Sequence, residues 1–549
     1  MVHSPLQIWF ESSLIGRLLY WFLDVWDQSL VRRSFSAVSR FAGRVFAGSV
    51  LGRLLYTDWP LAGDLSTGVV GRAVAGIGRW LDRLSHRIGP FLRGLWETSW
   101  LVRSASWLAS RLAPVVETSF LAGAFTGFSR DVVLAAEEGD PRPTSPLVYL
   151  LGAVLGLIPL IPADASPSPT VLMVLGIWGT ALLWGLRKVA LESCQWRVSG
   201  AALSLLVLLV VAAASTVQSI DPSTSFVQLV LWLTAALVFF MVTDLVRNSR
   251  DAAALLGPIF AGCAVMALWG FYQVIHPPHV EETWVDPTTS GQMVRIFASM
   301  GNPNYLGEYM ALYLPLGAAL WLQHPRRQWA TMVPLLLMAA TLLLTGSRGA
   351  WLALLVAGMV FVLMRGGRWT VFLLLGLLAA PVVLPDWVLQ RLAAAFLLAD
   401  SSAQYRLNMW KGVAAMLDKY WALGTGIGAE VFAKGYEEFM LPGARAAHAH
   451  NLYLQSFAEM GILGLVAVLW TLAAVIRRPL VAGMRPGSSY LTAAVPAALL
   501  GLLVHGLVEY IWYNPKLLFA FWAVAGLGAG LALGNPETAA VETDGRPVT

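Results

Sequence analysis

Residues 447–475 read AHAHNLYLQSFAEMGILGLVAVLWTLAAV, a change within a few positions from a polar segment to an apolar one. The apolar part is long enough to cross a bilayer as a helix, at about 1.5 Å per residue. The polar part closes a long insert, residues 386–451, that lies between hydrophobic segments. Because polar groups can meet a polar substrate only outside the hydrocarbon, we expect the chemistry of this chain to lie in that insert.

The composition of the whole chain indicates a membrane protein. Its 549 residues are 57% hydrophobic and 13% charged, with a mean hydropathy of +0.66, and a soluble domain could not bury that much apolar surface. The two cysteines, Cys194 and Cys263, provide neither a disulfide framework nor a CxxC metal site. The formal net charge is +5, but the arginines are scattered through short loops, which argues against nucleic acid as a partner.

Apolar blocks that follow residue 145 predict an all-α polytopic membrane protein of about twelve transmembrane helices. The predicted spans cover residues 146–163, 169–186, 200–217, 226–244, 254–275, 305–323, 329–345, 349–365, 369–385, 452–475, 490–511 and 516–534. With both termini cytoplasmic, the cytoplasmic connections carry most of the arginines, as the positive-inside rule requires. Residues 146–534 then form one membrane domain, and the insert 386–451, between spans 9 and 10, is extracytoplasmic.

The two ends of the chain differ from this membrane domain. Residues 1–130 contain 14 arginines and 8 acidic residues interleaved with Trp, Phe and Leu, in segments too short or too charged to span. We therefore expect residues 1–145 to form a basic amphipathic helical region on the cytoplasmic membrane surface. In a non-catalytic alternative, this region is a docking platform for assembly partners. The acidic tail, residues 535–549, is predicted to be disordered and cytoplasmic.

Among the arginines on the predicted outer side, where the topology rule disfavours positive charge, three are candidates for ligand binding. Arg348 lies between spans 7 and 8, Arg406 lies on a predicted amphipathic helix of the insert, and Arg295 precedes a span entrance. A guanidinium group binds phosphate oxygens bidentately, so this set indicates a phosphate or pyrophosphate ligand. The alternative is that each arginine snorkels to lipid headgroups or closes an ion pair.

Near the end of the insert, His450 adds a group that can take a proton from a hydroxyl if a neighbour fixes its tautomer. The alternative is an interfacial histidine that caps the helix starting near Asn451. His448 is a weaker candidate, because a two-residue offset on a helix points it elsewhere. In an extended segment it would share the side of His450.

Ionisable residues within or near the predicted spans are costly enough to need partners. They are Glu308, Glu459, His505 and Glu509. His505 and Glu509 are four residues apart on one helical face, so they could form an internal structural pair, and the alternative is a functional role. Because a proton-coupled transporter would use such groups, a multi-span solute transporter is the alternative function. The sequence shows neither an inverted repeat nor paired broken spans, which argues against it.

Five short motifs follow one another between residues 254 and 533. They are Arg295 with Gly301-Asn302-Pro303-Asn304, then Thr345-Gly346-Ser347-Arg348-Gly349, then Arg406 with Trp410, then Gly424-Thr425-Gly426-Ile427-Gly428, and finally His450-Asn451-Leu452-Tyr453-Leu454-Gln455 with Glu459-Met460-Gly461-Ile462-Leu463-Gly464. In this order, and on the predicted outer side, they resemble the motifs of the bacterial O-antigen ligase and O-antigen polymerase family.

The resemblance implies a membrane glycosyltransferase of the GT-C type. Such an enzyme moves a glycan from an undecaprenyl-pyrophosphate carrier to an acceptor hydroxyl at the outer face of the cytoplasmic membrane. The resemblance implies that Arg348 and Arg406 bind the pyrophosphate and that His450 is the base. Further candidates for substrate binding are Arg295, Asn304, Asn451 and Glu459.

The resemblance also implies an inverting reaction that needs neither a metal nor a cofactor. The expected partners are the lipid-linked glycan donor, a glycan or lipid acceptor, and the lipid bilayer. Ligase and polymerase activities both stay open, because they differ in the acceptor.

Overall fold

The computed structural model describes residues 144–534, apart from 163–167, 191–198, 278–294, 324–327, 367, 384–388, 390–400 and 486. Within this part of the chain the regular elements are helices, as the sequence predicts. The predicted basic region up to residue 143 and the predicted acidic tail lie outside the described residues.

In the described residues, a helix coincides with each predicted apolar block. These helices are α9 (Pro146–Leu157), α10 (Pro169–Ala190), α11 (Ala201–Val217), α12 (Pro222–Leu245), α13 (Ser249–Ile275), α14 (Pro303–Gln323), α15 (Gln328–Leu344), α16 (Arg348–Arg365), α17 (Arg368–Val383), α21 (Leu452–Met484), α22 (Tyr490–His505) and α23 (Pro515–Gly534). Six of them, α10, α12, α13, α16, α21 and α23, are long and apolar enough to cross a membrane, and α9, α11, α15 and α22 contain shorter apolar helices. The protein is therefore a multi-pass membrane protein whose regular elements, in the part of the chain that the structure describes, are helices.

Several helices start where a polar side chain caps their first turn. The side chain accepts a hydrogen bond from a backbone N–H two or three residues further on, which satisfies a donor that the helix itself leaves unpaired. The capping residues of α9, α12, α13 and α22 are Ser145, Asp221, Asn248 and Ser489. Pro146 and Pro222 follow two of these caps, at the position where a helix tolerates proline best.

Small residues let the central helix α23 pack closely against α12. A Cβ added at Gly526 would lie 2.7 Å from the carbonyl oxygen of Phe239. One added at Gly530, a turn further along α23, would lie 2.6 Å from the carbonyl oxygen of Val246. In a membrane, such glycine contacts allow backbones to approach and gain van der Waals contact. The apolar length of α23 is accordingly almost wholly buried, whereas only 22% of that of α10 is buried.

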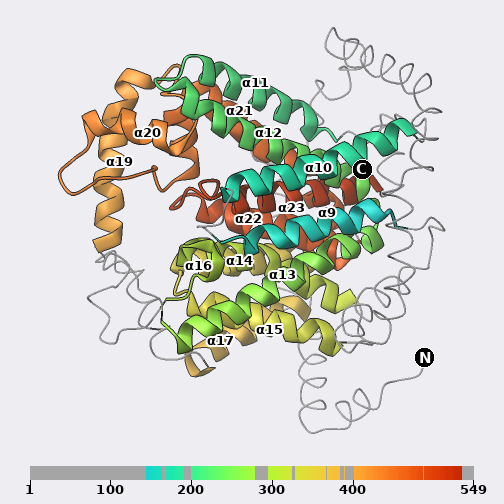
Figure 1. The fold of residues 1–549 in the computed structure, drawn as a ribbon. Helices are drawn as coiled ribbons and strands as arrows, with labels where there is room; N and C mark the ends of the chain where they lie inside the picture. The colour runs from blue at the N-terminus through green and yellow to red at the C-terminus, as the bar shows by residue number, and fades with distance from the viewer. Residues whose placement is uncertain are drawn as a thin grey trace, which may run out of the picture.

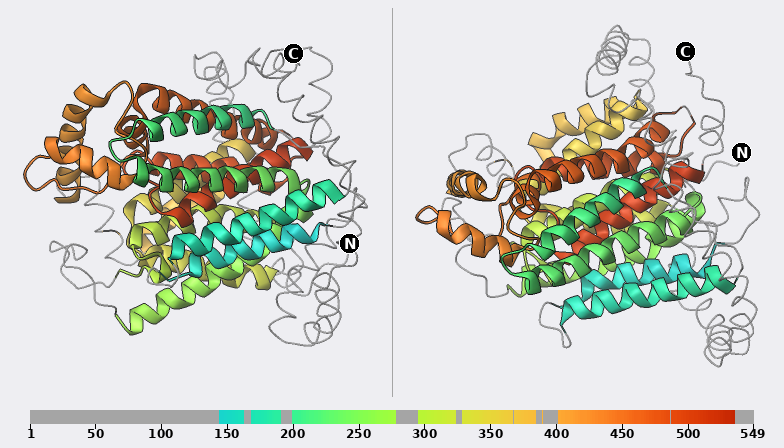
Figure 2. Two further views of the ribbon diagram at one scale, coloured as in Figure 1. Left: turned by 45° about the horizontal axis from the view of Figure 1, so that its top comes forward. Right: turned by 90° about the horizontal axis from the view of Figure 1, so that it is seen from above.

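The polar insert lies beyond one end of the helical bundle (Figures 1 and 2). Its described residues form α19 (Ser401–Tyr420), α20 (Ala429–Tyr436) and the short 3-10 helix η6 (Glu437–Phe439), so it is more helical than its polar composition suggested. Met409, Val413 and Met416 recur every three or four residues along α19 and pack with Phe432 of α20 in a small core separate from that of the bundle. The predicted amphipathic helix that carries Arg406 is therefore present.

A break in α21 at Gly461 receives the loop that joins α19 to α20. Gly461 has a φ of 64°, and a Cβ added there would lie 2.2 Å from the carbonyl oxygen of Ala422. Across the same contact, a Cβ at Gly424 would lie 2.2 Å from the carbonyl oxygen of Glu459. That oxygen accepts a hydrogen bond from the Gly426 N–H at 3.0 Å. The loop therefore satisfies a carbonyl that the helix break leaves open.

We expect Gly461→Ala to lower the free energy of unfolding by about 2 kcal/mol or more, because a side chain is strained at this φ and meets backbone atoms that cannot move aside. Thermal unfolding of the purified protein in detergent measures the effect. Gly358→Ala, in α16, is the matched control, since an added Cβ meets nothing within 4 Å there. Equal melting temperatures for the two variants would contradict this account of the break.

Helix α22 ends at His505, short of the predicted end of its span. The Gly506 N–H closes the last turn, and residues 506–514 form a loop. The predicted helical pair of His505 and Glu509 is therefore wrong, because Glu509 lies on that loop. His505 Nδ1 instead lies 3.6 Å from Oε1 of the buried Glu308.

Candidate active site

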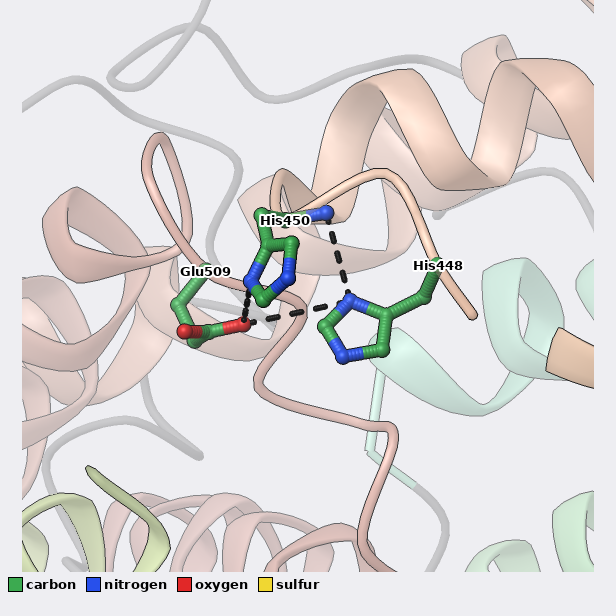
Figure 3. A group of neighbouring side chains, drawn as sticks. All are labelled: His448, His450 and Glu509. Carbon is green, nitrogen blue, oxygen red and sulfur yellow. Dashed lines mark hydrogen bonds and ion pairs between the residues drawn. The ribbon is translucent and has the colours of Figure 1, made fainter. Parts of the chain in front are cut away.

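The loop after α22 brings Glu509 to His450, at the end of the insert (Figure 3). Their closest atoms, His450 Nδ1 and Glu509 Oε1, are 2.8 Å apart. The Glu509 side chain is 2% exposed and that of His450 is 26% exposed. An ionised carboxylate can only accept a hydrogen bond, so Nδ1 carries the proton and Nε2 of the neutral ring is left as an acceptor. Glu509 is thus the neighbour that fixes the tautomer of His450.

Other groups also converge on the Glu509 carboxylate. Its Oε1 accepts a hydrogen bond from the Tyr510 N–H at 3.1 Å, and its Oε2 lies 3.5 Å from Asn304 Nδ2 and 3.9 Å from Arg406 Nη2. Burial opposes ionisation, but the neighbouring imidazoles, that of His450 foremost, and the Arg406 guanidinium hold the pKa of Glu509 below its usual value. The carboxylate is therefore ionised at neutral pH.

His448 lies against the same pair in a supporting position. Its ring centroid is 4.1 Å from that of His450, and its Nδ1 accepts the His450 backbone N–H at 3.2 Å. Burial, together with the adjacent His450, lowers the pKa of His448 to about 3, so this ring is neutral at physiological pH. The two histidines lie close together on a segment that is neither helical nor regularly extended, since His450 has a φ of 42°.

The backbone of His450 is strained and is held by bonds on both sides. Its φ is 42°, a value that few residues other than glycine adopt. The preceding residue, Ala449, donates its N–H to Gln455 Oε1 at 2.6 Å and accepts the indole N–H of Trp410 at 2.8 Å. The following residue, Asn451, caps the first turn of α21 with its side chain. Strain that neighbours maintain in this way is typical of functional positions.

Asn451 and Glu459, two predicted candidates for substrate binding, hold this segment in place. The Asn451 side chain both caps α21 and donates to the carbonyl oxygen of Leu507, in the loop that carries Glu509, at 2.8 Å. Glu459 is fully buried, and its Oε1 accepts hydrogen bonds from Gln455 Nε2 at 2.8 Å and from a loop N–H. Because Gln455 in turn holds the turn before His450, Glu459 acts on the site through it.

Arg295 and Asn304 approach Glu509 from the other side of the site. Arg295 donates from Nη2 to Asn304 Oδ1 and from Nε to the carbonyl oxygen of Thr345, both at 2.8 Å. Asn304 then reaches Glu509 with its amide nitrogen. Thr345 begins the turn that leads into α16, whose first residue is Arg348.

The two arginines predicted to bind pyrophosphate occupy different positions relative to Glu509. Arg406 is 24% exposed and directs its guanidinium group towards the Glu509 carboxylate. Arg348 is half-buried at the start of α16, and the next residue, Gly349, packs so closely on His505 that an added Cβ would lie 2.1 Å from its Nε2. The start of α16 is thus fixed to the end of α22, immediately before the loop with Glu509.

Sequence reasoning missed the role of Glu509. The sequence did contain one signal of this role: Glu509 is an acidic residue within an apolar block, where a charged group needs a partner. Helical spacing suggested His505 as that partner, but the helix ends before Glu509 and the true partner is 59 positions away, at His450.

His448, His450 and Glu509 also form a group that could hold a metal ion, with ligand atoms within 4.8 Å of one another. Two imidazoles and a carboxylate are a donor set that zinc accepts. In the structure, however, Nδ1 of His448 accepts a backbone N–H, and Nδ1 of His450 bonds to Glu509. A metal bound to these two atoms would have to displace both hydrogen bonds. That the site works without a metal stays a prediction, which chelation tests.

The helical bundle and the polar site at its end define the class: a multi-pass membrane protein with histidines, a buried carboxylate and arginines gathered at one end of the bundle. A family model described as O-Antigen ligase matches residues 333–469, from α15 through the insert into α21. Residues 333–469 are therefore similar to O-antigen ligases, and this match supports the predicted resemblance to the O-antigen ligase and polymerase family. The matched segment includes Arg348, Arg406 and His450, whereas Glu509 lies outside it. No curated protein matches the chain.

Proposed function

We propose that this protein is a glycosyltransferase that moves a glycan from an undecaprenyl-pyrophosphate carrier to an acceptor hydroxyl at the outer face of the cytoplasmic membrane. The observation that carries the proposal is the convergence on Glu509 of His450, Arg406 and the Arg295–Asn304 pair, which come from separate parts of the chain. The match to O-antigen ligases supports the same class of reaction.

In the proposed reaction His450 is the general base. Its Nε2 accepts the proton of the acceptor hydroxyl while the hydroxyl oxygen attacks the anomeric carbon of the glycan. The bond from that carbon to the pyrophosphate oxygen breaks, so the anomeric configuration inverts. Glu509 keeps Nε2 free in the resting enzyme and stabilises the imidazolium that forms.

The arginines act on the leaving group. Negative charge accumulates on the lipid pyrophosphate as the glycosidic bond breaks, and guanidinium groups held in place bind it more strongly in the transition state than in the ground state. We assign this role to Arg348 and Arg406. Arg295, which is hydrogen-bonded to Asn304 beside Glu509, is a third candidate for binding the leaving group.

The transporter alternative depended on His505 and Glu509 as paired groups inside one span. Glu509 lies on a loop and bonds to His450, so the two groups are not paired inside one span. Together with the match to O-antigen ligases, this arrangement does not favour a transporter.

A purified system tests the proposal. The protein in detergent, given an undecaprenyl-pyrophosphate glycan and an acceptor, should release lipid pyrophosphate and lengthen the acceptor. Products that grow by repeated units on a lipid-linked acceptor would indicate a polymerase, and a single transfer to a lipid acceptor would indicate a ligase. Failure to release lipid pyrophosphate, combined with solute counterflow in proteoliposomes, would favour the transporter instead.

We expect EDTA treatment to leave the transfer rate unchanged, because the proposed charge stabilisation comes from arginines. Added zinc should inhibit, since it would compete for the His450 lone pair and displace the bond to Glu509. Initial rates before and after chelation, followed by addition of divalent ions, measure both effects. A loss with EDTA that a divalent ion reverses would show that the cluster of two histidines and a carboxylate is a metal site.

A further inference from the structure

A cavity lies at the opposite end of the bundle from His450. Helix α16 begins beside the candidate active site and runs 18 residues to Arg365, which at 1.5 Å per residue places its far end about 27 Å away. Helix α21 likewise begins after His450 and ends at Met484. The far ends of these helices, with the end of α14 and the start of α22, line a cavity of about 690 Å³.

Two guanidinium groups line this cavity. Arg365 donates from Nη1 to the Ser488 hydroxyl at 3.0 Å and from Nη2 to the Ser488 carbonyl oxygen at 2.6 Å, and it lies over the ring of Tyr490. Arg365 is thus fixed in place. Arg485 differs, because its buried Nη1 has no hydrogen-bond partner among the described residues.

A second polar atom in the lining is also unpaired. Oε1 of Gln323, at the end of α14, is buried and has no hydrogen-bond partner in the described part of the chain. Unpaired donors and acceptors in buried positions are costly, so a cavity with one of each favours a ligand that both accepts and donates. Trp369 and Tyr490 also line the cavity, and such rings are common at the level of lipid headgroups.

We propose that this cavity binds a phosphate ester that carries a free hydroxyl, the chemistry of a glycerol phosphate group. Arg485 and Arg365 bind the phosphate oxygens, to which guanidinium groups are suited in geometry and charge. Gln323 Oε1 accepts the hydrogen bond of the hydroxyl. The ligand is either the headgroup of a glycerophospholipid or a soluble glycerol phosphate, and its binding does not depend on the proposed transfer reaction.

Binding is measured on the full-length protein in neutral detergent by thermal shift and native mass spectrometry. The probes are phosphatidylglycerol, phosphatidylmethanol, which lacks the hydroxyl, phosphatidylcholine, and glycerol 3-phosphate. We expect phosphatidylglycerol to bind best among the lipids, and Arg485→Gln to weaken its binding about tenfold, the effect of one charge-assisted bond. Arg477→Gln is the matched control, since Arg477 lies on α21, the helix that Arg485 directly follows, but does not line the cavity.

The soluble probe separates the two sources of ligand. Stabilisation by glycerol 3-phosphate that Arg485→Gln removes would support the proposal with a soluble ligand, and a response to phosphatidylglycerol alone would support it with a lipid. Gln323→Leu, which keeps both arginines, should remove the preference for phosphatidylglycerol over phosphatidylmethanol. This variant tests the proposal if Arg485→Gln does not fold. Equal binding of phosphatidylglycerol and phosphatidylcholine without a response to glycerol 3-phosphate, or equal losses in Arg485→Gln and Arg477→Gln, would overturn the proposal.

Discussion

Replacement of His450 by glutamine should lower the rate of glycan transfer by about a hundredfold or more, the usual contribution of a general base. Glutamine has a similar size and can still donate a hydrogen bond to Glu509, but it cannot take a proton from the acceptor hydroxyl. The arginines remain in place, so kcat should fall while KM for the lipid-linked donor stays near its wild-type value. Release of lipid pyrophosphate under initial-rate conditions measures both constants.

His276→Gln is the matched control for this variant. His276 is an exposed histidine at the end of α13, and we expect its replacement to leave the rate unchanged. Melting temperatures of both variants show whether the fold is kept. Transfer by a folded His450→Gln protein at the wild-type rate would remove His450 from the mechanism.

The positions of the membrane helices could be predicted from the sequence because each apolar block is long enough to show its period and its hydrophobicity. The end of α22 could not be predicted in this way. Gly506, Leu507 and Val508 continue the apolar composition of the helix, so composition alone does not mark the loop that follows His505. Only tertiary contacts identify this loop. One such contact is the hydrogen bond from the Asn451 side chain to the Leu507 carbonyl oxygen.

The candidate site could be predicted only in part for a related reason. His450 and Arg406 carry chemistry that can be recognised one residue at a time, and the family resemblance adds to it. The partner of His450 depends on a contact between distant segments, which spacing cannot reveal. The sequence also does not show that the carboxyl group of Glu459, a predicted substrate-binding candidate, is fully buried.

Glu509 also makes the stability of the protein depend on pH. Its pKa is held below its usual value in the folded protein, mainly by the neighbouring His450 imidazole against the effect of burial. A depressed carboxyl pKa stabilises the fold above the unfolded pKa, and that contribution is lost as the pH falls through the folded value. Melting temperatures of the wild type and of Glu509→Gln should therefore differ most near neutral pH and converge in acid.

Glu509→Gln should lower kcat by about a hundredfold or more, through the tautomer of His450. The carboxylate accepts the Nδ1 proton, whereas an amide can donate to Nδ1 and so favours the ring with its proton on Nε2. That tautomer has no lone pair for the acceptor hydroxyl, although His450 itself is intact. A merely structural role would raise KM and leave the tautomer of His450 unchanged, whereas the tautomer mechanism lowers kcat in an enzyme that still binds the donor. Nitrogen NMR of labelled His450 reports the tautomer, and an unchanged tautomer in Glu509→Gln, or a wild-type kcat, would refute this role of Glu509.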